Sequence, residues 1–327
     1  MTSSMQNNEP ITQATTVANP SNKREIIAWN RHRRQDRTVS DWIVDSIIAI
    51  IVIAVIVAII YPLWFIIIAS FSSPTAVSIG DVTFWPKGTS LTGYAKILTD
   101  TRIWMGYRNT LLYSIVGTAV NLLVTIPAAY ALSRREFKPR RIIMFLFTFT
   151  MFFSGGLIPS YLLMKQLGLI NSMWVFILPG AFSVYNMIIA RSFFETSIPE
   201  ELRDSARVDG VSYFGFFFKI VLPLSGAILA VIGLYFFVGH WNDYFTGLIY
   251  IRDEGKYPLQ NVLQMILLTN QTTQGSGNVG MSATQAQNFA DQIKFGIIIV
   301  SSLPLLVLYP FLQKYFNKGV MIGAVKG

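Results

Sequence analysis

Residues 197–223 carry the polar side chains of this chain that could do chemistry. The stretch reads SIPEELRDSARVDGVSYFGFFFKIVLP and places carboxylates and guanidinium groups between two apolar runs. The chain has no cysteine, and His32 and His240 are its only histidines. No nucleophile and base, and no set of metal ligands, can be assembled from these residues, so an integral-membrane enzyme is poorly supported. The function that remains for these charged residues is non-covalent contact with another surface.

The first half of this stretch predicts a short helix. Ser197 and Glu200 have the form of a capping box with Pro199 in the first turn. Gly210 stands where a left-handed residue would end the helix after about Val208. Spacings of three, four and seven place four residues on one face: Leu202, Ser205, Ala206 and Asp209. Small side chains on that face would let another protein approach closely, and a plain surface helix between two membrane spans is the alternative.

The composition excludes an ordinary soluble domain. Of the 327 residues, 52% are hydrophobic and 13% are charged, whereas soluble domains carry about 25% charged residues. The net charge of +9 does not indicate a nucleic-acid partner, because the basic residues flank apolar runs and no basic, aromatic face accompanies them. We therefore expect a membrane protein surrounded by lipid.

Six apolar runs predict an all-α integral membrane fold with six transmembrane helices, since about 20 apolar residues cross a bilayer. The runs are Ile47–Ala69, Thr110–Leu132, Ile142–Leu163, Ser172–Ile189, Val221–Gly239 and Phe295–Phe311. They contain no Asp, Glu, Lys, Arg or His. A self-sufficient channel or secondary transporter, which is the alternative function, would need such carriers of ions or protons inside the membrane.

The basic residues predict the orientation of these runs. They gather before the first run, between the second and third, and after the sixth, and such clusters mark the cytoplasmic side. Both termini and residues 197–223 are then cytoplasmic. The predicted domains are a cytoplasmic tail at 1–41, a membrane domain at 42–318 and a second cytoplasmic tail at 319–327.

Two longer segments are predicted on the outer side. Residues 71–108 include FWPKGTSLTGYAKIL, which is typical of a hairpin or short helix. Residues 251–294 become rich in Gln, Asn, Gly and Ser in their second half. That composition indicates a flexible or ligand-facing loop, because it offers little apolar area to bury.

Polar and aromatic residues near the predicted membrane region could contact a sugar, which is bound by hydrogen bonds and ring stacking. The third run is also interrupted by glycines, a break tolerated in a membrane where it is covered by protein or lines a wet cavity. The candidate substrate-pathway residues are Ser154, Gly155, Gly156, Tyr161, Tyr185, Asn186, Trp241 and Asn242. Plainer alternatives are helix packing at the glycines, an interfacial aromatic belt for Tyr161 and Trp241, an interhelical bond for Asn186, and a solvated helix end for His240 and Asp243.

The stretch DSARVDG resembles the cytoplasmic EAA signature of permease subunits of ABC importers. That signature has an EAA triplet, a glycine four residues later and, after nine more, I-x-L-P. The matching residues are Asp204, Ser205 and Ala206 for the triplet, Gly210 for the glycine, and Ile220, Leu222 and Pro223 for the tail. Asp for Glu and Ser for Ala depart from the signature but keep size and polarity close.

Other segments resemble the maltose-type carbohydrate permeases, especially the branch that takes up oligosaccharides or polysaccharide fragments. They are YRNTLLYSIVGTAVNLLVTIPAAYALSRREF, FTMFFSGGLIPSYLLMKQLGLINS and GHWNDYFTGLIYIRDEGKYPLQ, and the likeness extends from about Trp42 to GVMIGAVKG. It implies the type I ABC importer permease fold. It also implies four kinds of partner: a homologous second permease, two ATPase subunits, an extracytoplasmic solute-binding protein and a carbohydrate substrate.

In that family the EAA loop docks on the ATPase, which implies a coupling role for Leu202, Asp204, Ser205, Ala206, Asp209, Gly210, Ile220, Leu222 and Pro223. The chain itself has no G-x-x-x-x-G-K-[ST] phosphate loop, because its one Gly-Lys pair, Gly255-Lys256, is followed by Tyr257. We therefore expect no cofactor on this chain, with ATP and Mg²⁺ bound by the partner ATPase subunits in the cytoplasm beneath a bacterial inner membrane.

Overall fold

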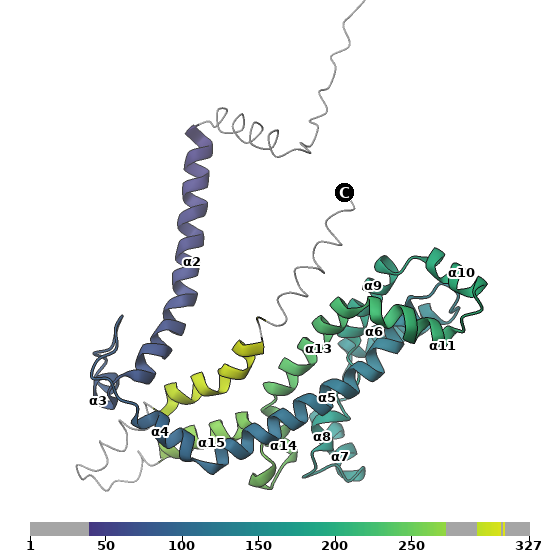
Figure 1. Cartoon of the computed structure of the whole chain (residues 1–327). Coiled ribbons are helices and arrows are strands. Elements are labelled where there is room, and N and C mark those ends of the chain that lie inside the picture. Colours follow the sequence, from purple (N-terminus) through teal and green to yellow (C-terminus); the bar gives the residue numbers. More distant parts are fainter. Residues whose placement is uncertain (1–38, 273–292, 309, 311–327) are drawn as a thin grey trace, which may run out of the picture. The chain divides into compact units, whose positions relative to one another are not determined.

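The computed structural model describes residues 39–272, 293–308 and 310. Every regular element in these ranges is a helix (Figure 1). Contacts divide the chain into two compact units, residues 1–63 and 64–327, which are described separately. Most of the predicted 1–41 tail, the polar part of loop 251–294 and the predicted 319–327 tail lie outside the described residues.

Two helices are each long and apolar enough to cross a membrane. They are α2 (Val39–Phe71) and α5 (Thr101–Ser133), with 33 residues each. At about 1.5 Å per residue, each measures about 50 Å, which exceeds the roughly 30 Å of a bilayer core. The first two predicted runs are therefore confirmed as helices that extend beyond the apolar segments.

The third, fourth and fifth predicted runs are not single straight helices. Their elements are α6 (Arg140–Phe152), α7 (Leu157–Gln166), α8 (Trp174–Ile177), α9 (Val184–Ser197), α11 (Tyr213–Phe216), η1 (Phe217–Val221), α12 (Leu222–Leu224) and α13 (Gly226–Trp241). The α6 and α7 axes differ by 110°, and the axis of α13 differs by 80° from that of the Tyr213–Leu224 segment. Gly156 turns the chain between α6 and α7 with φ +85°, a value that glycine adopts readily.

These breaks leave the predicted count of six spans unconfirmed. In the described residues two single helices are long and apolar enough to cross a membrane, and the number of spans rises to at most four if each bent pair of helices is counted as one span. A further apolar helix, Ile293–Leu308, occupies most of the sixth predicted run. The apolar pattern predicted the helical segments, and the break predicted at the glycines of the third run is present between α6 and α7, whereas the bend before α13 was not predicted.

The two segments predicted as outer loops are largely helical. The first contains α3 (Pro74–Ser78) and α4 (Thr92–Thr99), as predicted. The second follows α14 (Phe245–Tyr250) and contains η2 (Glu254–Lys256) and α15 (Leu259–Thr272). The flexible or ligand-facing loop was predicted for the polar half of this segment, from Thr269 onward, and only residues 269–272 of it are described, as the end of α15. Apolar residues at 259, 262, 263 and 266 have helical spacing and are buried against α5 and Trp241.

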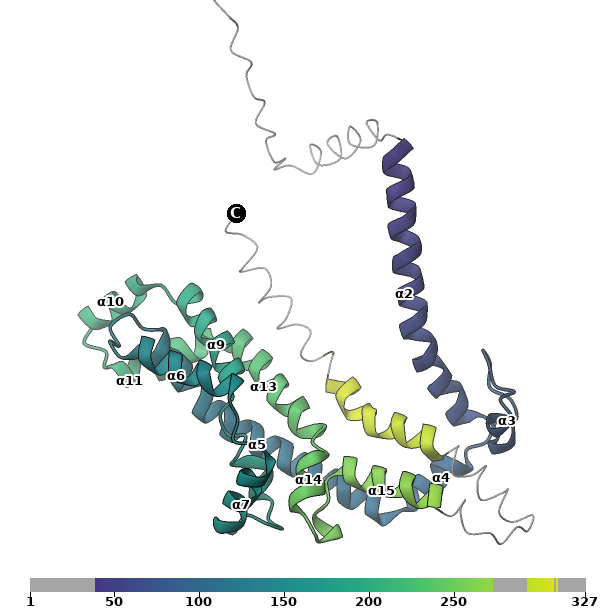
Figure 2. The same cartoon turned by 180° about the vertical axis from the view of Figure 1, so that it is seen from behind.

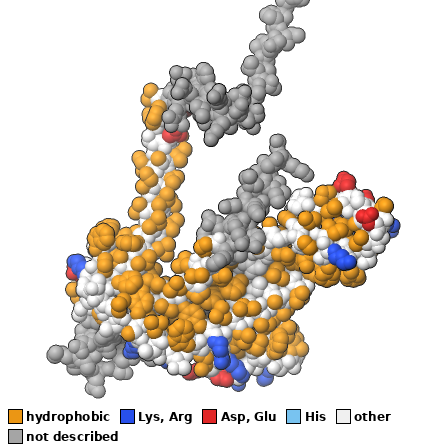
Figure 3. Space-filling model, viewed as in Figure 1, with side chains coloured by type: hydrophobic (Ala, Val, Ile, Leu, Met, Phe, Trp, Pro, Cys, Tyr) orange, Lys and Arg blue, Asp and Glu red, His pale blue; other side chains and the backbone are white. Residues whose placement is uncertain are grey.

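Helix α5 is the central element of the second unit, and α9, α13 and α15 all pack along it (Figures 1 and 2). One core joins the C-terminal half of α5 to α9, α11 and α13 through Ile126, Phe194 and Ile232. Hydrophobic side chains cover much of the face in Figure 3, and charged side chains gather along its lower edge and at the end where α10 (Glu200–Val208) lies. That charged end contains the residues of the predicted coupling loop.

Candidate functional site

The short helix predicted in residues 197–223 is present as α10, but it begins differently. Ser197 is the last residue of α9, and only Ile198 and Pro199 separate the two helices. A helical Ser197 cannot cap the next helix, so the predicted capping box is wrong. Pro199 is the residue before α10, and it provides no side-chain cap.

The end of α10 matches the prediction. Gly210 has φ +74°, and its N–H donates to the carbonyl of Arg207 at 3.1 Å. The next residue, Val211, donates to the carbonyl of Ala206 at 2.9 Å. These two bonds form a Schellman motif, which needs a left-handed residue at the position of Gly210. No neighbouring atom lies within 4 Å of a Cβ added there, so the requirement for glycine is one of backbone conformation.

The face of α10 that was predicted to meet another protein is divided. Ala206 is only 6% exposed and packs in the core that also includes Phe194 and Phe216, with Leu202 partly buried against it. Ser205 is exposed, and its hydroxyl donates to the carbonyl of Glu201 at 3.0 Å. The prediction that Ala206 is offered to a partner is therefore wrong, because its small side chain lets α10 approach this chain's own core. The exposed members of the predicted coupling set are Asp204, Ser205, Asp209, Gly210 and Pro223.

Charged contacts attach α10 to the turn between α5 and α6. The Arg203 guanidinium donates to the carboxylate of Glu136, and it lies 4.8 Å from the ring centre of Tyr213. One helical turn earlier, Glu200 pairs with Arg135 at 3.3 Å. Burial opposes the charge of Arg203, but the bond and charge of Glu136 outweigh it, so the pKa of Arg203 lies above its ordinary value.

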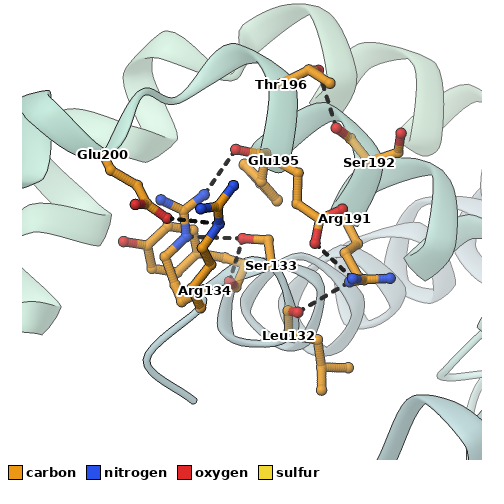
Figure 4. A network of polar contacts seen from close by, with 11 residues as sticks. Leu132, Ser133, Arg134, Arg191, Ser192, Glu195, Thr196 and Glu200 are labelled. Carbon is orange, nitrogen blue, oxygen red and sulfur yellow. Dashed lines mark hydrogen bonds and ion pairs between the residues drawn. The ribbon is translucent and has the colours of Figure 1, made fainter. Parts of the chain in front are cut away.

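Two arginines connect the C-terminal ends of α5 and α9 (Figure 4). Arg134, which follows α5, donates to the carbonyl of Phe194 on α9 at 2.8 Å. In the reverse direction Arg191 on α9 donates to the carbonyl of Leu132 on α5 at 3.0 Å, and it pairs with Glu195 at 2.6 Å. Cations at helix C-termini satisfy carbonyls that have no partner within the helix. The ends of α5, α9 and α10 are thereby joined.

The tail of the EAA-like stretch lies on an irregular helical segment. Ile220 belongs to the π-helix η1, whereas Leu222 and Pro223 begin α12 just before the bend into α13. The side chains of Ile220 and Leu222 pack against the same core as Ala206. This segment connects the core beneath α10 to α13, and π-helical turns of this kind occur frequently at functional sites.

The predicted substrate-pathway residues do not converge. Ser154, Gly155 and Gly156 are exposed at the break between α6 and α7. Tyr161 stacks on Tyr250 with ring centres 5.8 Å apart. Tyr185 is exposed, whereas its neighbour Asn186 is buried.

Trp241 is fully buried and donates to the carbonyl of Ser301 at 3.2 Å, so it has no surface for a sugar. Asn242 is exposed just after α13. Its neighbour His240 is not a solvated helix end, because it lies within α13 and its Nε2 is 2.8 Å from Oδ1 of Asn121. The amide nitrogen of Asn121 donates to the carbonyl of Gly180, so Oδ1 accepts and His240 Nε2 carries the proton.

The His240–Asn121 contact is the main feature that the sequence analysis did not identify. Gly117 makes it possible, because a Cβ at that position would overlap the imidazole ring. The signal in the sequence was a line of small polar residues at helical spacing: Ser114, Thr118, Asn121 and Thr125. Within the described ranges no group of three His, Asp or Glu residues could hold a metal ion.

The comparisons with known proteins agree with this architecture. Residues 103–322 match the family model described as a binding-protein-dependent transport system inner membrane component. The chain is 39% identical to protein LplC of Bacillus subtilis (strain 168) over 268 residues, which cover 82% of this chain and 90% of LplC. It is also 39% identical over 269 residues to the polygalacturonan/rhamnogalacturonan transport system permease protein YtcP of the same organism, covering 82% and 93% of the two chains.

A solved structure is similar as well. A chain from the crystal structure of a bacterial ABC transporter involved in the import of the acidic polysaccharide alginate matches with a TM-score of 0.76 and 31% identity. The match covers 86% of this chain and 99% of that one. The all-helical arrangement around α5 is accordingly a type I ABC permease fold. The chain belongs to the family of binding-protein-dependent transport system inner membrane components.

Proposed function

We propose that this chain is a permease subunit of an ATP-driven importer that takes up an oligosaccharide or a polysaccharide fragment. Similar proteins support this substrate class, since they are named for polygalacturonan/rhamnogalacturonan transport, arabinooligosaccharide transport and the import of alginate. The chain would work with a second permease, two ATPase subunits that bind ATP and Mg²⁺, and an extracytoplasmic solute-binding protein. Its six spans would place both termini and α10 in the cytoplasm.

One observation carries the proposed coupling role of α10. The helix buries its apolar face in this chain and leaves a polar face exposed, together with Val208, which is 88% exposed. Val208 projects among charged residues away from this chain, where a partner protein could cover it. The docking surface that we propose is therefore the exposed side of α10 around Asp204, Val208 and Asp209.

Two sets of contacts connect α10 to the membrane domain, and either could transmit a movement of this helix. Ala206 and Leu202 pack in the core shared with α9 and α13. Arg203 and Glu200 are bonded to the turn that joins α5 to α6. Motion of an ATPase that moves α10 would thus be transmitted to the helices that surround the transport path.

Substitution of Gly210 tests this proposal. Gly210→Val strains the left-handed turn that ends α10, and we expect uptake of labelled oligosaccharide and substrate-stimulated ATP hydrolysis to be lost in the reconstituted importer, with membrane insertion unchanged. Gly168→Val is the matched control, because Gly168 has φ +69°, also has open space around it, and lies on the predicted opposite side of the membrane. Unchanged uptake by the Gly210 variant would contradict the proposal. Transport by the purified chain without an ATPase would instead favour a channel or secondary transporter.

A further inference from the structure

A groove with a volume of about 490 Å³ lies between the C-terminal end of α5 and the α10–α11 segment. Its walls include Tyr130, Arg134, Glu136, Arg203, Tyr213 and Phe217. All of these residues are within the second unit, so the groove does not depend on how the two units are placed. It is separate from the exposed docking surface proposed for α10.

The chemistry of the groove changes along α5. Pro127 and Ala131 line one part, and both belong to the apolar run predicted to lie in the membrane. Arg134 lines the other part, just beyond that run. Pro127 and Arg134 are seven positions apart, which corresponds to about 10 Å along a helix. An occupant would therefore meet apolar side chains toward the membrane and guanidinium groups toward its surface.

The charged part of the groove has an excess of positive charge. Arg203 and Glu136 neutralise each other, which leaves the charge of Arg134. In the part of the chain that the structure describes, Arg134 bonds through Nε to the hydroxyl of Ser133 and through Nη2 to the carbonyl of Phe194, both neutral acceptors. The guanidinium carbon of Arg134 also lies over the ring of Tyr130, 5.0 Å from its centre. The Nη1 donors remain for a ligand, and an anion is the ligand that complements this charge.

We propose that this groove binds one anionic phospholipid, with its phosphate on Arg134 and an acyl chain along Ala131 and Pro127. A free anion would use the arginine but not the apolar part, whereas a phospholipid uses both. Basic pockets beside membrane helices hold lipid headgroups by the same combination of contacts. The bound lipid would lie beside the joined ends of α5, α9 and α10, independently of which saccharide is transported.

Lipid retention in the assembled importer tests the headgroup contact. The complex containing the full chain is purified from membranes rich in phosphatidylglycerol, and retained lipid is measured by native mass spectrometry. Arg134→Gln should reduce retained phosphatidylglycerol about tenfold, because it removes a charged hydrogen-bond donor. The matched control is Arg141→Gln, which removes the same charge from an exposed residue outside the groove and should leave retention unchanged.

A second variant tests the acyl contact without changing charge or the bond to Phe194. Ala131→Trp fills the apolar part from an exposed position, so it disturbs no buried packing, and it should also abolish retention. The proposal is overturned if Ala131→Trp retains the lipid, if Arg141→Gln loses as much as Arg134→Gln, or if excess inorganic phosphate displaces the lipid from the unsubstituted complex. Retention by Ala131→Trp would indicate another occupant of the groove, an equal loss in Arg141→Gln would indicate binding to diffuse surface charge, and displacement by phosphate would indicate a site for a soluble anion.

Discussion

The C-terminal end and the middle of α5 are held by different kinds of contact. At the C-terminal end, the bonds are made by arginines such as Arg134 and Arg203 to carbonyls and to a partly exposed carboxylate. In the middle of the helix the bonds from Thr110 and Asn121 are neutral and buried: the Thr110 hydroxyl accepts from the N–H of Leu259 at 2.7 Å, and Asn121 accepts from His240. Thr110 and Asn121 are both fully buried.

This difference predicts unequal resistance to rearrangement. An exposed ion pair contributes about 0 to 1 kcal/mol, because water and salt replace it easily. A buried donor or acceptor that loses its partner costs about 1 to 3 kcal/mol, because no water replaces the bond. We therefore predict that the end of α5 beside α10 exchanges its contacts more easily than the part held by Thr110 and Asn121.

Gly117→Ala should have the largest effect on stability. Its Cβ overlaps the imidazole of His240, which cannot move without breaking its bond to Asn121, so we expect a loss of about 3 kcal/mol. The measurement is thermal unfolding of the purified complex by tryptophan fluorescence. Gly233→Ala is the control, because its added Cβ makes only ordinary contact at 3.5 Å with Leu122. Equal melting temperatures for the two variants would contradict the tight packing at His240.

Thr110→Val should be next in size. It leaves the buried N–H of Leu259 without an acceptor, and the expected loss is about 2 kcal/mol. Thr118→Val on the same helix is isosteric and removes a buried hydroxyl that has no hydrogen-bond partner among the described residues, so that variant should lose nothing. If both variants unfold at the same temperature in the same fluorescence assay, the Thr110 bond does not hold α15 to α5.

Arg203→Gln should affect stability less and function more. The partner carboxylate of Glu136 is half exposed, so the expected cost is below about 1 kcal/mol. Uptake should fall severalfold, because α10 loses its bond to the α5–α6 turn. The double variant with Glu136→Gln should be no less stable than either single variant, since both remove one interaction. Additive losses would show that the two side chains act separately.

Asp100→Asn should have the smallest effect, and that effect should depend on pH. The Asp100 carboxylate caps α5, and its hydrogen bond from the side chain of Arg102 lowers the pKa of this carboxyl despite partial burial. A lowered folded pKa stabilises the protein above the unfolded pKa of about 4, and the gain is lost as pH falls through the folded value. The wild type should therefore exceed the variant by at most about 1 kcal/mol at pH 7 and converge with it as the pH falls below the lowered pKa of Asp100. A constant difference across that range would exclude this cause.

The sequence was sufficient to predict the helical membrane class and the end of α10 at Gly210, because apolar run length and helix-terminating glycine are local signals. The glycines at 155 and 156 also indicated the break in the third run, where the bend lies. The sequence was not sufficient to predict the bend in the fifth run or the burial of Ala206 and Trp241. Those features depend on which surfaces meet in the fold. The His240–Asn121 bond was missed for the same reason, since the two residues are 119 positions apart.

Photocrosslinking from α10 tests the central claim most directly. With p-benzoylphenylalanine at Val208, illumination of the assembled importer should crosslink this chain to the ATPase subunit, and addition of ATP should change the yield. The same group at Leu167, an exposed position on the predicted opposite side, should give no ATPase crosslink. An ATPase crosslink from Leu167 and none from Val208 would contradict the proposed entry of ATP-driven motion through α10.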